Sequence, residues 1–150
     1  MKDPNWIESM QNLGSIRLFA SLYLRKARKG AVTSAQEVDM LFRVALGERL
    51  TTPLELSREM GISKTMISRL IENLTGKQLI EKVYNKEDKR SYFLSVTEKG
   101  KAELDTMYYY YLDPLYELQK NLGEASYSEL LRLIEKANHS MTGESKEEFF

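Results

Sequence analysis

Hydrophobic residues recur at helical spacing along most of this chain, and strict alternation appears near residues 91–96. The first periodic segment covers residues 5–28, where an apolar residue returns every three or four positions. Lysine and arginine fill its last turn and Gly30 follows, a pattern typical of a helix C-terminus. We therefore expect a long amphipathic helix over residues 5–28.

Two short helices are predicted next, and the start of each carries a capping sequence. Ser34 with Glu37 matches a capping box, in which each side chain bonds a backbone N–H of the first turn. Thr52 with Glu55 repeats the pattern, and Pro53 stands at the first helical position, where a missing N–H is tolerated. We expect each of these helices to end at the next glycine of the sequence.

Residues 63–75 are predicted to form another amphipathic helix, with Ser63 as its N-cap. The apolar stripe follows the i, i+3, i+4, i+7 pattern and consists of Ile67, Leu70, Ile71 and Leu74. The opposite face is polar and cationic. Because a glycine-containing turn of about three or four residues separates this helix from the one before it, the pair indicates a helix-turn-helix.

Strand signals follow the helix-turn-helix. Tyr92, Leu94 and Val96 alternate with residues of the other face, and the segment 82–84 can pair back antiparallel. The polar tip 85–90 lies between them and reads Asn-Lys-Glu-Asp-Lys-Arg. This pattern predicts a two-stranded hairpin with a charged tip, the wing of a winged helix.

The C-terminal part is predicted to contain two helices and a tail. Thr97 is the expected N-cap of a long helix to about residue 121, and Pro114 within it predicts a kink, or a break and restart. Ser126 with Glu129 offers a capping box for a last helix to about residue 141. Residues 142–150 are charged and lack periodicity, which indicates a flexible tail.

Composition excludes several function classes for this chain of 150 residues. It has no cysteine and a single histidine, so cysteine redox chemistry, Cys-based zinc sites and His-rich metal sites are excluded. The sequence shows no Gly-rich phosphate loop, nucleophile triad or metal-spaced cluster, so we expect no enzyme, catalytic residue, metal or cofactor. Because no apolar run approaches the ~18–20 residues of a membrane span and no signal peptide is apparent, we expect a cytoplasmic protein without a membrane partner.

The charge of the chain is balanced overall but unevenly distributed. Lysine plus arginine and aspartate plus glutamate number 22 each, a formal net charge of +0. Residues 63–101 hold nine basic and five acidic side chains, a net +4, which leaves −4 for the rest. The excess of positive charge therefore coincides with the predicted helix and wing.

The predicted helix 63–75 has the properties of a DNA recognition helix. The major groove is about 12 Å wide and admits one α-helix, which needs an apolar back and a face of short polar and cationic side chains. Free N–H groups at a helix N-terminus favour phosphates, and Arg69 is the best candidate for a bidentate contact to a guanine edge. The candidate DNA-binding residues of this helix are Ser63, Lys64, Thr65, Ser68 and Arg69.

The predicted wing supplies a second group of candidate DNA contacts. Lys86, Lys89 and Arg90 suit phosphates or insertion into a narrow minor groove, where the negative potential is enhanced. Asp88 stands among them, and we expect it to pair with Arg90 and hold the shape of the wing. Each signal is weak when taken alone, but their order along the chain favours DNA binding.

Residues 33–100 resemble the MarR family of winged-helix transcription regulators. The motifs that carry the resemblance include Thr33-Ser34-Ala35-Gln36, Gly61-Ile62-Ser63-Lys64-Thr65-Met66-Ile67-Ser68-Arg69, Asp88-Lys89-Arg90 and Leu94-Ser95-Val96-Thr97-Glu98-Lys99-Gly100. The chain departs from the family at Gln78, where glycine is common, and at Lys82, where arginine is frequent.

The resemblance implies a mainly α fold with a small two-stranded β-wing, in which long N- and C-terminal helices flank a winged helix-turn-helix. The DNA-binding domain would cover residues 31–100, and residues 5–30 plus 101–141 would form a homodimer. Such a dimer reads a pseudo-palindromic double-stranded operator through two equivalent helices. Family members usually act as repressors, and many bind a small aromatic or phenolic ligand between the dimer helices and the winged helix.

Two questions stay open at the level of sequence. The tyrosine run 108–111, with Tyr116, either packs in the dimer core or lines a ligand cavity with Phe19, Tyr23 or Phe42. The ligand-binding residues are therefore unassigned. The alternative to a sequence-specific regulator is a winged helix that serves as a non-specific DNA-binding or protein-interaction module.

Overall fold

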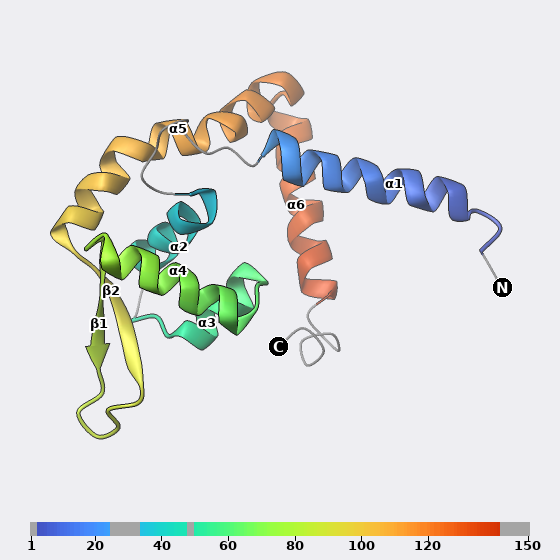
Figure 1. Cartoon of the computed structure of the whole chain (residues 1–150). Coiled ribbons are helices and arrows are strands. Elements are labelled where there is room, and N and C mark those ends of the chain that lie inside the picture. Colours follow the sequence, from blue (N-terminus) through green and yellow to red (C-terminus); the bar gives the residue numbers. More distant parts are fainter. Residues whose placement is uncertain (1–2, 25–33, 48–49, 142–150) are drawn as a thin grey trace.

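The computed structural model describes residues 3–24, 34–47 and 50–141. In chain order its elements are α1 (Trp6–Leu18), the π-helical turn η1 (Phe19–Tyr23), α2 (Ala35–Leu46), α3 (Pro53–Met60), α4 (Lys64–Gly76), β1 (Ile80–Tyr84), β2 (Tyr92–Val96), α5 (Glu98–Leu122) and α6 (Glu124–Ser140). Helices α2 to α4 and the hairpin form one body, from which α5 leads to α6, while α1 extends to the side (Figure 1). The predicted mainly α fold with a two-stranded wing is confirmed.

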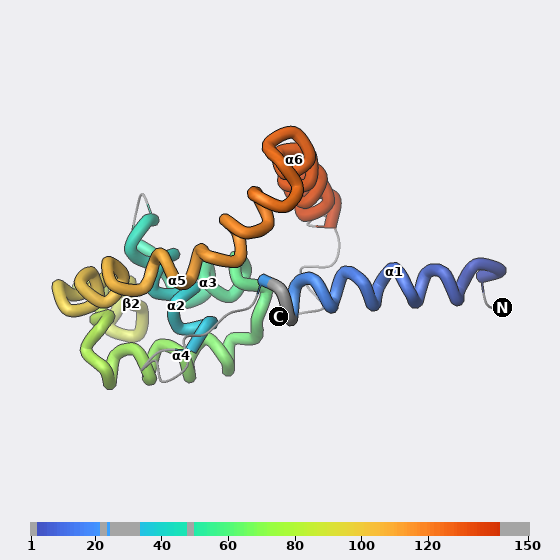
Figure 2. The backbone as a smooth tube through the Cα atoms, turned by 90° about the horizontal axis from the view of Figure 1, so that it is seen from above, coloured from blue at the N-terminus to red at the C-terminus, as the bar shows by residue number. Residues whose placement is uncertain are grey.

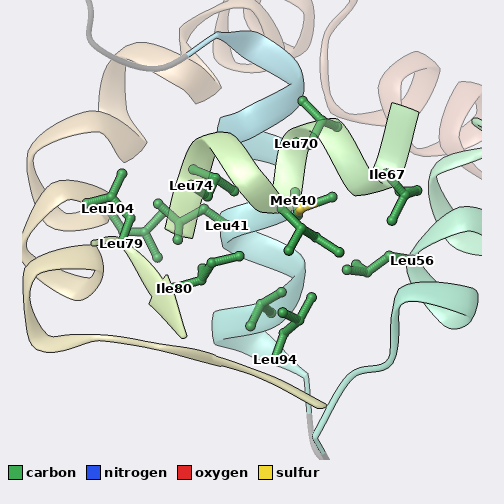
Figure 3. Packing of buried hydrophobic residues seen from close by; sticks show 12 residues of the cluster. Met40, Leu41, Leu56, Ile67, Leu70, Leu74, Leu79, Ile80, Leu94 and Leu104 are labelled. Atoms are coloured by element: carbon green, nitrogen blue, oxygen red, sulfur yellow. The ribbon is translucent and has the colours of Figure 1, made fainter. Parts of the chain in front are cut away.

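The hydrophobic core lies within the winged helix (Figure 3). Its twelve buried members are Met40, Leu41, Val44, Leu56, Ile67, Leu70, Ile71, Leu74, Leu79, Ile80, Leu94 and Leu104. They come from α2, α3 and α4, from both strands and the residue before β1, and from the start of α5. The predicted apolar stripe of α4 is confirmed in full. Burial at roughly 25 cal/mol per Å² of apolar surface makes this cluster the main stabilising element of the body.

Helix α2 is the central element of this body. It packs against α3, α4, β2 and α5. At its outer side Phe42 stacks on Tyr111 of α5, with ring centroids 5.7 Å apart and an interplanar angle of 24°. Offset stacking of this kind adds about 0.5–1.5 kcal/mol to the burial of the two rings. The Phe42–Tyr111 contact therefore joins the winged helix to the long C-terminal helix.

The predicted helix starts are confirmed at Ser34, Thr52, Ser63 and Thr97, whose side chains each accept a hydrogen bond from a first-turn backbone N–H. The reciprocal capping box forms at Thr52 and Glu55. The box predicted at Ser34 is half formed. Ser34 Oγ accepts from the Glu37 N–H at 3.2 Å, but the Glu37 carboxylate bonds Lys77 instead. A lysine from a distant helix thus competes successfully with a local backbone donor.

The C-terminal helices differ in detail from the prediction. Helix α5 continues through Pro114 without a break, and Figures 1 and 2 show one bent helix. A proline removes one backbone donor and crowds the preceding turn, which a bend can accommodate. The capping box predicted at Ser126 and Glu129 is wrong, because Gly123 ends α5 and α6 begins at once at Glu124. Glu129 bonds Arg132 instead.

The predicted N-terminal helix is shorter as an α-helix than its apolar pattern suggested. Helix α1 gives way after Leu18 to the π-helical turn η1, and the end of the predicted segment, residues 25–28, lies outside the described residues. Helix α1 extends away from the other elements (Figure 2), and neither α1 nor α6 has a buried residue. Their apolar stripes remain exposed, for example Ile7 at 59%, Ile16 at 65% and Leu133 at 47%.

The wing is an antiparallel hairpin in which Ile80 pairs with Val96, Lys82 with Leu94 and Tyr84 with Tyr92. Strand β1 begins at Ile80, two residues earlier than predicted. On its other side β2 forms a bridge with Thr51, whose carbonyl accepts from the Leu94 N–H at 2.8 Å. This bridge attaches the base of the wing to the segment before α3.

Candidate DNA-binding interface

The turn between α3 and α4 is held by local hydrogen bonds. Gly61 ends α3 in the left-handed conformation, with φ at 65°, a region that glycine enters without steric cost. The buried Ser57 hydroxyl donates to the Ile62 carbonyl at 2.8 Å. Ser63 then caps α4 by accepting from the Met66 N–H at 3.2 Å. The start of α4 is therefore fixed relative to α3.

Helix α4 turns its apolar stripe into the core and its polar residues to solvent. All five candidate DNA-binding residues of this segment are exposed: Ser63, Lys64, Thr65, Ser68 and Arg69. Glu72 is exposed one turn after Ser68. The N-terminal two turns of α4 thus present hydroxyl and cationic groups without a neighbouring element over them, as a helix that enters a groove must.

The C-terminal end of α4 is fixed by an ion pair that the sequence did not reveal. Lys77 Nζ lies 2.5 Å from Glu37 Oε2, and the Glu37 side chain is only 8% exposed. Lys99 Nζ of α5 donates to the Lys77 carbonyl at 3.0 Å. Glu37 lies in the first turn of α2 and Lys77 caps α4, so both charges also suit the helix dipoles. No spacing rule predicts a contact between residues 40 positions apart.

The tip of the wing is organised by Asp88. Asp88 Oδ1 accepts from the Arg90 backbone N–H at 3.0 Å and from Arg90 Nε at 3.3 Å, and Oδ2 accepts from Ser91 Oγ at 3.3 Å. The backbone N–H of Arg90, followed by its guanidinium, lowers the pKa of Asp88 below its ordinary value. Lys86, Lys89 and Arg90 are exposed around this turn, and the Arg90 side chain is 93% exposed.

An open hollow of about 810 Å³ lies between α2, β2 and α5. Phe42 and Tyr108 line it, together with Leu46, Lys101 and Asp105. Tyr109 is 67% exposed, and its ring centroid lies 5.7 Å from that of Tyr116. The tyrosine run therefore divides among different surroundings: one ring lines the hollow, one stacks on α2 and one faces solvent.

Tyr111 carries a pKa raised above its ordinary value, first because burial disfavours the phenolate and then because of the nearby Asp39 carboxylate. Arg43, which bonds Asp39 at 3.2 Å, opposes the shift. The phenol beside the Phe42 ring is thus held in its neutral form.

The described part of the chain contains neither a metal-binding cluster nor a membrane-spanning helix. Within residues 3–24, 34–47 and 50–141, no group of three or more histidine or acidic side chains could hold a metal ion. In the same ranges, every helix is too short or too polar to cross a membrane.

Comparison with known proteins agrees with this geometry. Residues 34–100 match the family described as winged helix DNA-binding domain. A cysteine-to-serine mutant of MarR from E. coli, solved with operator DNA, is 22% identical, with 91% of this chain and 99% of that chain covered and a TM-score of 0.72. BpsR of Bordetella bronchiseptica is 14% identical, with 89% and 98% covered and a TM-score of 0.71.

FabT of Streptococcus pneumoniae, solved in complex with DNA, is 17% identical, with 93% and 97% covered and a TM-score of 0.60. A search of curated proteins found no match. Residues 34–100 therefore have the fold of a winged helix domain and match the family of that description. The chain as a whole has the fold of MarR-type regulators, which confirms the resemblance at the level of the fold.

Proposed function

We propose that this protein is a sequence-specific transcription regulator that binds double-stranded DNA as a homodimer. The observation that carries the proposal is the exposed polar face of α4, fixed at both ends and flanked by a cationic wing. Ser63, Lys64, Thr65, Ser68 and Arg69 would meet the major groove, with Arg69 reading a guanine edge. Lys86, Lys89 and Arg90 would contact phosphates or the adjacent minor groove, with Asp88 holding the turn.

We assign DNA binding and dimerisation to different parts of the chain, according to which apolar residues are buried and which are exposed. Residues 31–100 would bind DNA, and residues 5–30 plus 101–141 would form the dimer. The support for a dimer is the exposed apolar stripe on α1 and on α6, since monomeric proteins rarely expose large contiguous apolar patches. A two-fold dimer would present two α4 helices to the half-sites of a pseudo-palindrome.

We further propose that a small molecule changes the affinity for DNA, with repression as the outcome at the promoter. The support is the hollow beside the Phe42–Tyr111 contact, at the boundary between the winged helix and α5. DNA binding by BpsR is regulated by 6-hydroxynicotinic acid. An aromatic or phenolic acid would match the aromatic and cationic lining offered by Phe42, Tyr108 and Lys101. We assign no catalytic residue.

The test is selection of genomic fragments by the purified protein, followed by footprinting of the best site. We expect a protected pseudo-palindrome with half-sites about one helical turn apart, bound roughly 10³-fold or more tightly than random DNA. Sedimentation at the binding concentration should show a dimer. Uniform recovery of fragments without a motif would instead support a non-specific DNA-binding or protein-interaction module.

A further inference from the structure

One face of the wing carries aromatic and cationic side chains beyond the edge of the core. Because side chains alternate along a strand, the paired residues Lys82 and Leu94 share a face with Tyr84 and Tyr92. Leu94 on this face is 1% exposed and points into the core (Figure 3). The face that bears Lys82, Tyr84 and Tyr92 is therefore the one turned toward the helices, and it continues past them along the hairpin (Figure 1).

These three side chains form one cluster, which we call the Lys82–Tyr92–Tyr84 stack although its rings are tilted. The rings of Tyr84 and Tyr92 have centroids 5.7 Å apart at an interplanar angle of 59°, and Lys82 Nζ lies 4.9 Å from the centroid of the Tyr92 ring. An ammonium over an aromatic face is attracted by the ring quadrupole. Tyr92 packs against the core, so the cation beside it is held close to a rigid support.

Tyr84, at the outer end of the stack, is 55% exposed. Tyr84 lies on the same face of β1 as Lys82, two residues further on, and directly before the cationic tip that begins at residue 85. Lysine ammonium and tyrosine hydroxyl groups are both among the donors that proteins direct at DNA phosphates. The stack thus combines an oriented ammonium group with a hydroxyl donor on the helix-facing side of the wing.

We propose that Lys82 and Tyr84 bind a backbone phosphate of the duplex whose groove α4 enters, and that Tyr92 positions Lys82 for this contact. The inference rests on the proposed DNA-binding function and extends it to Lys82 and Tyr84, which were not among the candidate DNA contacts of the sequence. The occupant is a phosphodiester because the groups are a cation and a hydroxyl donor, and because β1 leads directly into the tip with the exposed cations Lys86, Lys89 and Arg90. These contacts would add affinity without sequence preference.

The experiment compares Tyr84→Phe and Lys82→Gln with the wild type, using the selected operator and random DNA over a range of salt concentrations. Because Tyr84→Phe loses a hydrogen bond to a charged group, it should bind both DNAs about ten- to a hundredfold more weakly than the wild type. Lys82→Gln should lower the slope of log affinity against log salt by about 0.9 for each phosphate that the protein no longer neutralises. Val83→Thr is the matched control, because Val83 is 39% exposed on the opposite face of the same strand.

The positioning role of Tyr92 has its own test. Tyr92→Phe keeps the ring and should behave as the wild type, whereas Tyr92→Leu removes it and should reduce the salt slope toward that of Lys82→Gln. Circular dichroism melts identify any variant that fails to fold, and Tyr84→Phe with Tyr92→Phe keeps every ring in place.

The outcomes separate the two proposals. If the wild type binds its operator and both Tyr84→Phe and Lys82→Gln retain its affinity and salt slope, the phosphate contact is wrong and the proposed function stands. If the wild type binds no DNA at all, the proposed function fails, and this inference fails with it.

Discussion

The Thr97 hydroxyl donates a hydrogen bond to the backbone carbonyl of Gln78 at 2.6 Å. The same Oγ1 accepts from the Gly100 N–H at 3.0 Å, so Thr97 caps α5 and holds the chain before β1. Gln78 has a φ of 62°, and among the described residues it is the one non-glycine residue with positive φ. The position where the family commonly has glycine is thus held in a glycine-like conformation.

Gln78→Gly should stabilise the fold. A non-glycine residue in the left-handed region costs about 1–2 kcal/mol, and the greater flexibility of glycine in the unfolded chain offsets about 0.5–1 kcal/mol of that gain. We expect a net stabilisation of up to about 1.5 kcal/mol in denaturant unfolding at fixed protein concentration. Gln119→Gly in the interior of α5 is the control and should destabilise. A lower stability for Gln78→Gly would mean that the side chain, rather than the backbone, determines this position.

Gly100→Ala should be strongly destabilising. A Cβ at this position would lie 2.1 Å from the Leu79 carbonyl oxygen and 2.8 Å from Val96 Cγ1. Since the carbonyl is part of the backbone, α5 must shift, and overpacking of this kind costs about 1–3 kcal/mol or more. Gly76→Ala is the matched control, because nothing lies within 4 Å of its Cβ position. Thermal melts should place Gly76→Ala at or above the wild type and Gly100→Ala well below it.

The Glu37–Lys77 pair should contribute more to the free energy of unfolding than the exposed ion pairs do. Lys77→Met leaves a carboxylate that is 8% exposed without its partner, which should cost about 1–3 kcal/mol. The double variant Glu37→Gln with Lys77→Met should recover part of that loss. Lys101→Met breaks the exposed pair with Glu98 and should cost about 0.5 kcal/mol or less. Equal effects of Lys77→Met and Lys101→Met in urea unfolding would argue against a special role for the buried pair.

Arg69→Ala and Lys86→Ala should separate base reading from phosphate binding. Arg69→Ala should weaken operator binding by about 1–3 kcal/mol and relax specificity at one position of each half-site. Lys86→Ala should lower the affinity for operator and random DNA to a similar degree, and the affinity should then depend less on the salt concentration. Both are measured by titration of operator and random duplexes. An equal loss on both duplexes for Arg69→Ala would remove it from the recognition role.

The turn at Asp88 should lose stability as the pH falls. The folded wing lowers the pKa of Asp88, mainly through the Arg90 backbone N–H, below its ordinary 3.8. The stabilising contribution is therefore present above the unfolded pKa and is lost as the pH falls through the folded pKa. The Arg90 amide shift in NMR should titrate with a midpoint below 3.8, and Asp88→Asn should abolish that titration. A midpoint at or above this ordinary value would contradict the hydrogen-bonded turn.

The sequence predicted those elements whose signals are local. Helix starts at Thr52, Ser63 and Thr97 were readable because a cap and its partner lie within three residues of each other. The apolar stripe of α4 could be predicted because one face of the helix packs on the core, which places apolar residues at a regular helical spacing. The exposed placement of Lys64 and Arg69 follows from the same periodicity.

The features that sequence reasoning missed depend on contacts between distant elements. The Glu37–Lys77 pair and the placement of Lys82 over Tyr92 require the register of the hairpin and the packing of α2 on α4. At Pro114 the sequence left a kink and a break both open, and the structure has the bent, continuous helix. The propensity of the flanking residues for helix prevailed over one missing hydrogen bond. The start of α6 at Glu124 was missed, because the sequence offered a capping box at Ser126 that does not form.

The central place of α2 has a mechanical consequence for the proposed dimer. Because α2 packs against α3, α4, β2 and α5 together, we expect a displacement of α5 to move α2 and α4 with it as one rigid body. In the proposed dimer, two such bodies would be joined through their α1 and α6 helices, so the angle at this joint would set the distance between the two α4 helices. A rotation of a few degrees at the joint would change that distance, so the affinity for an operator would depend on the spacing between its two half-sites.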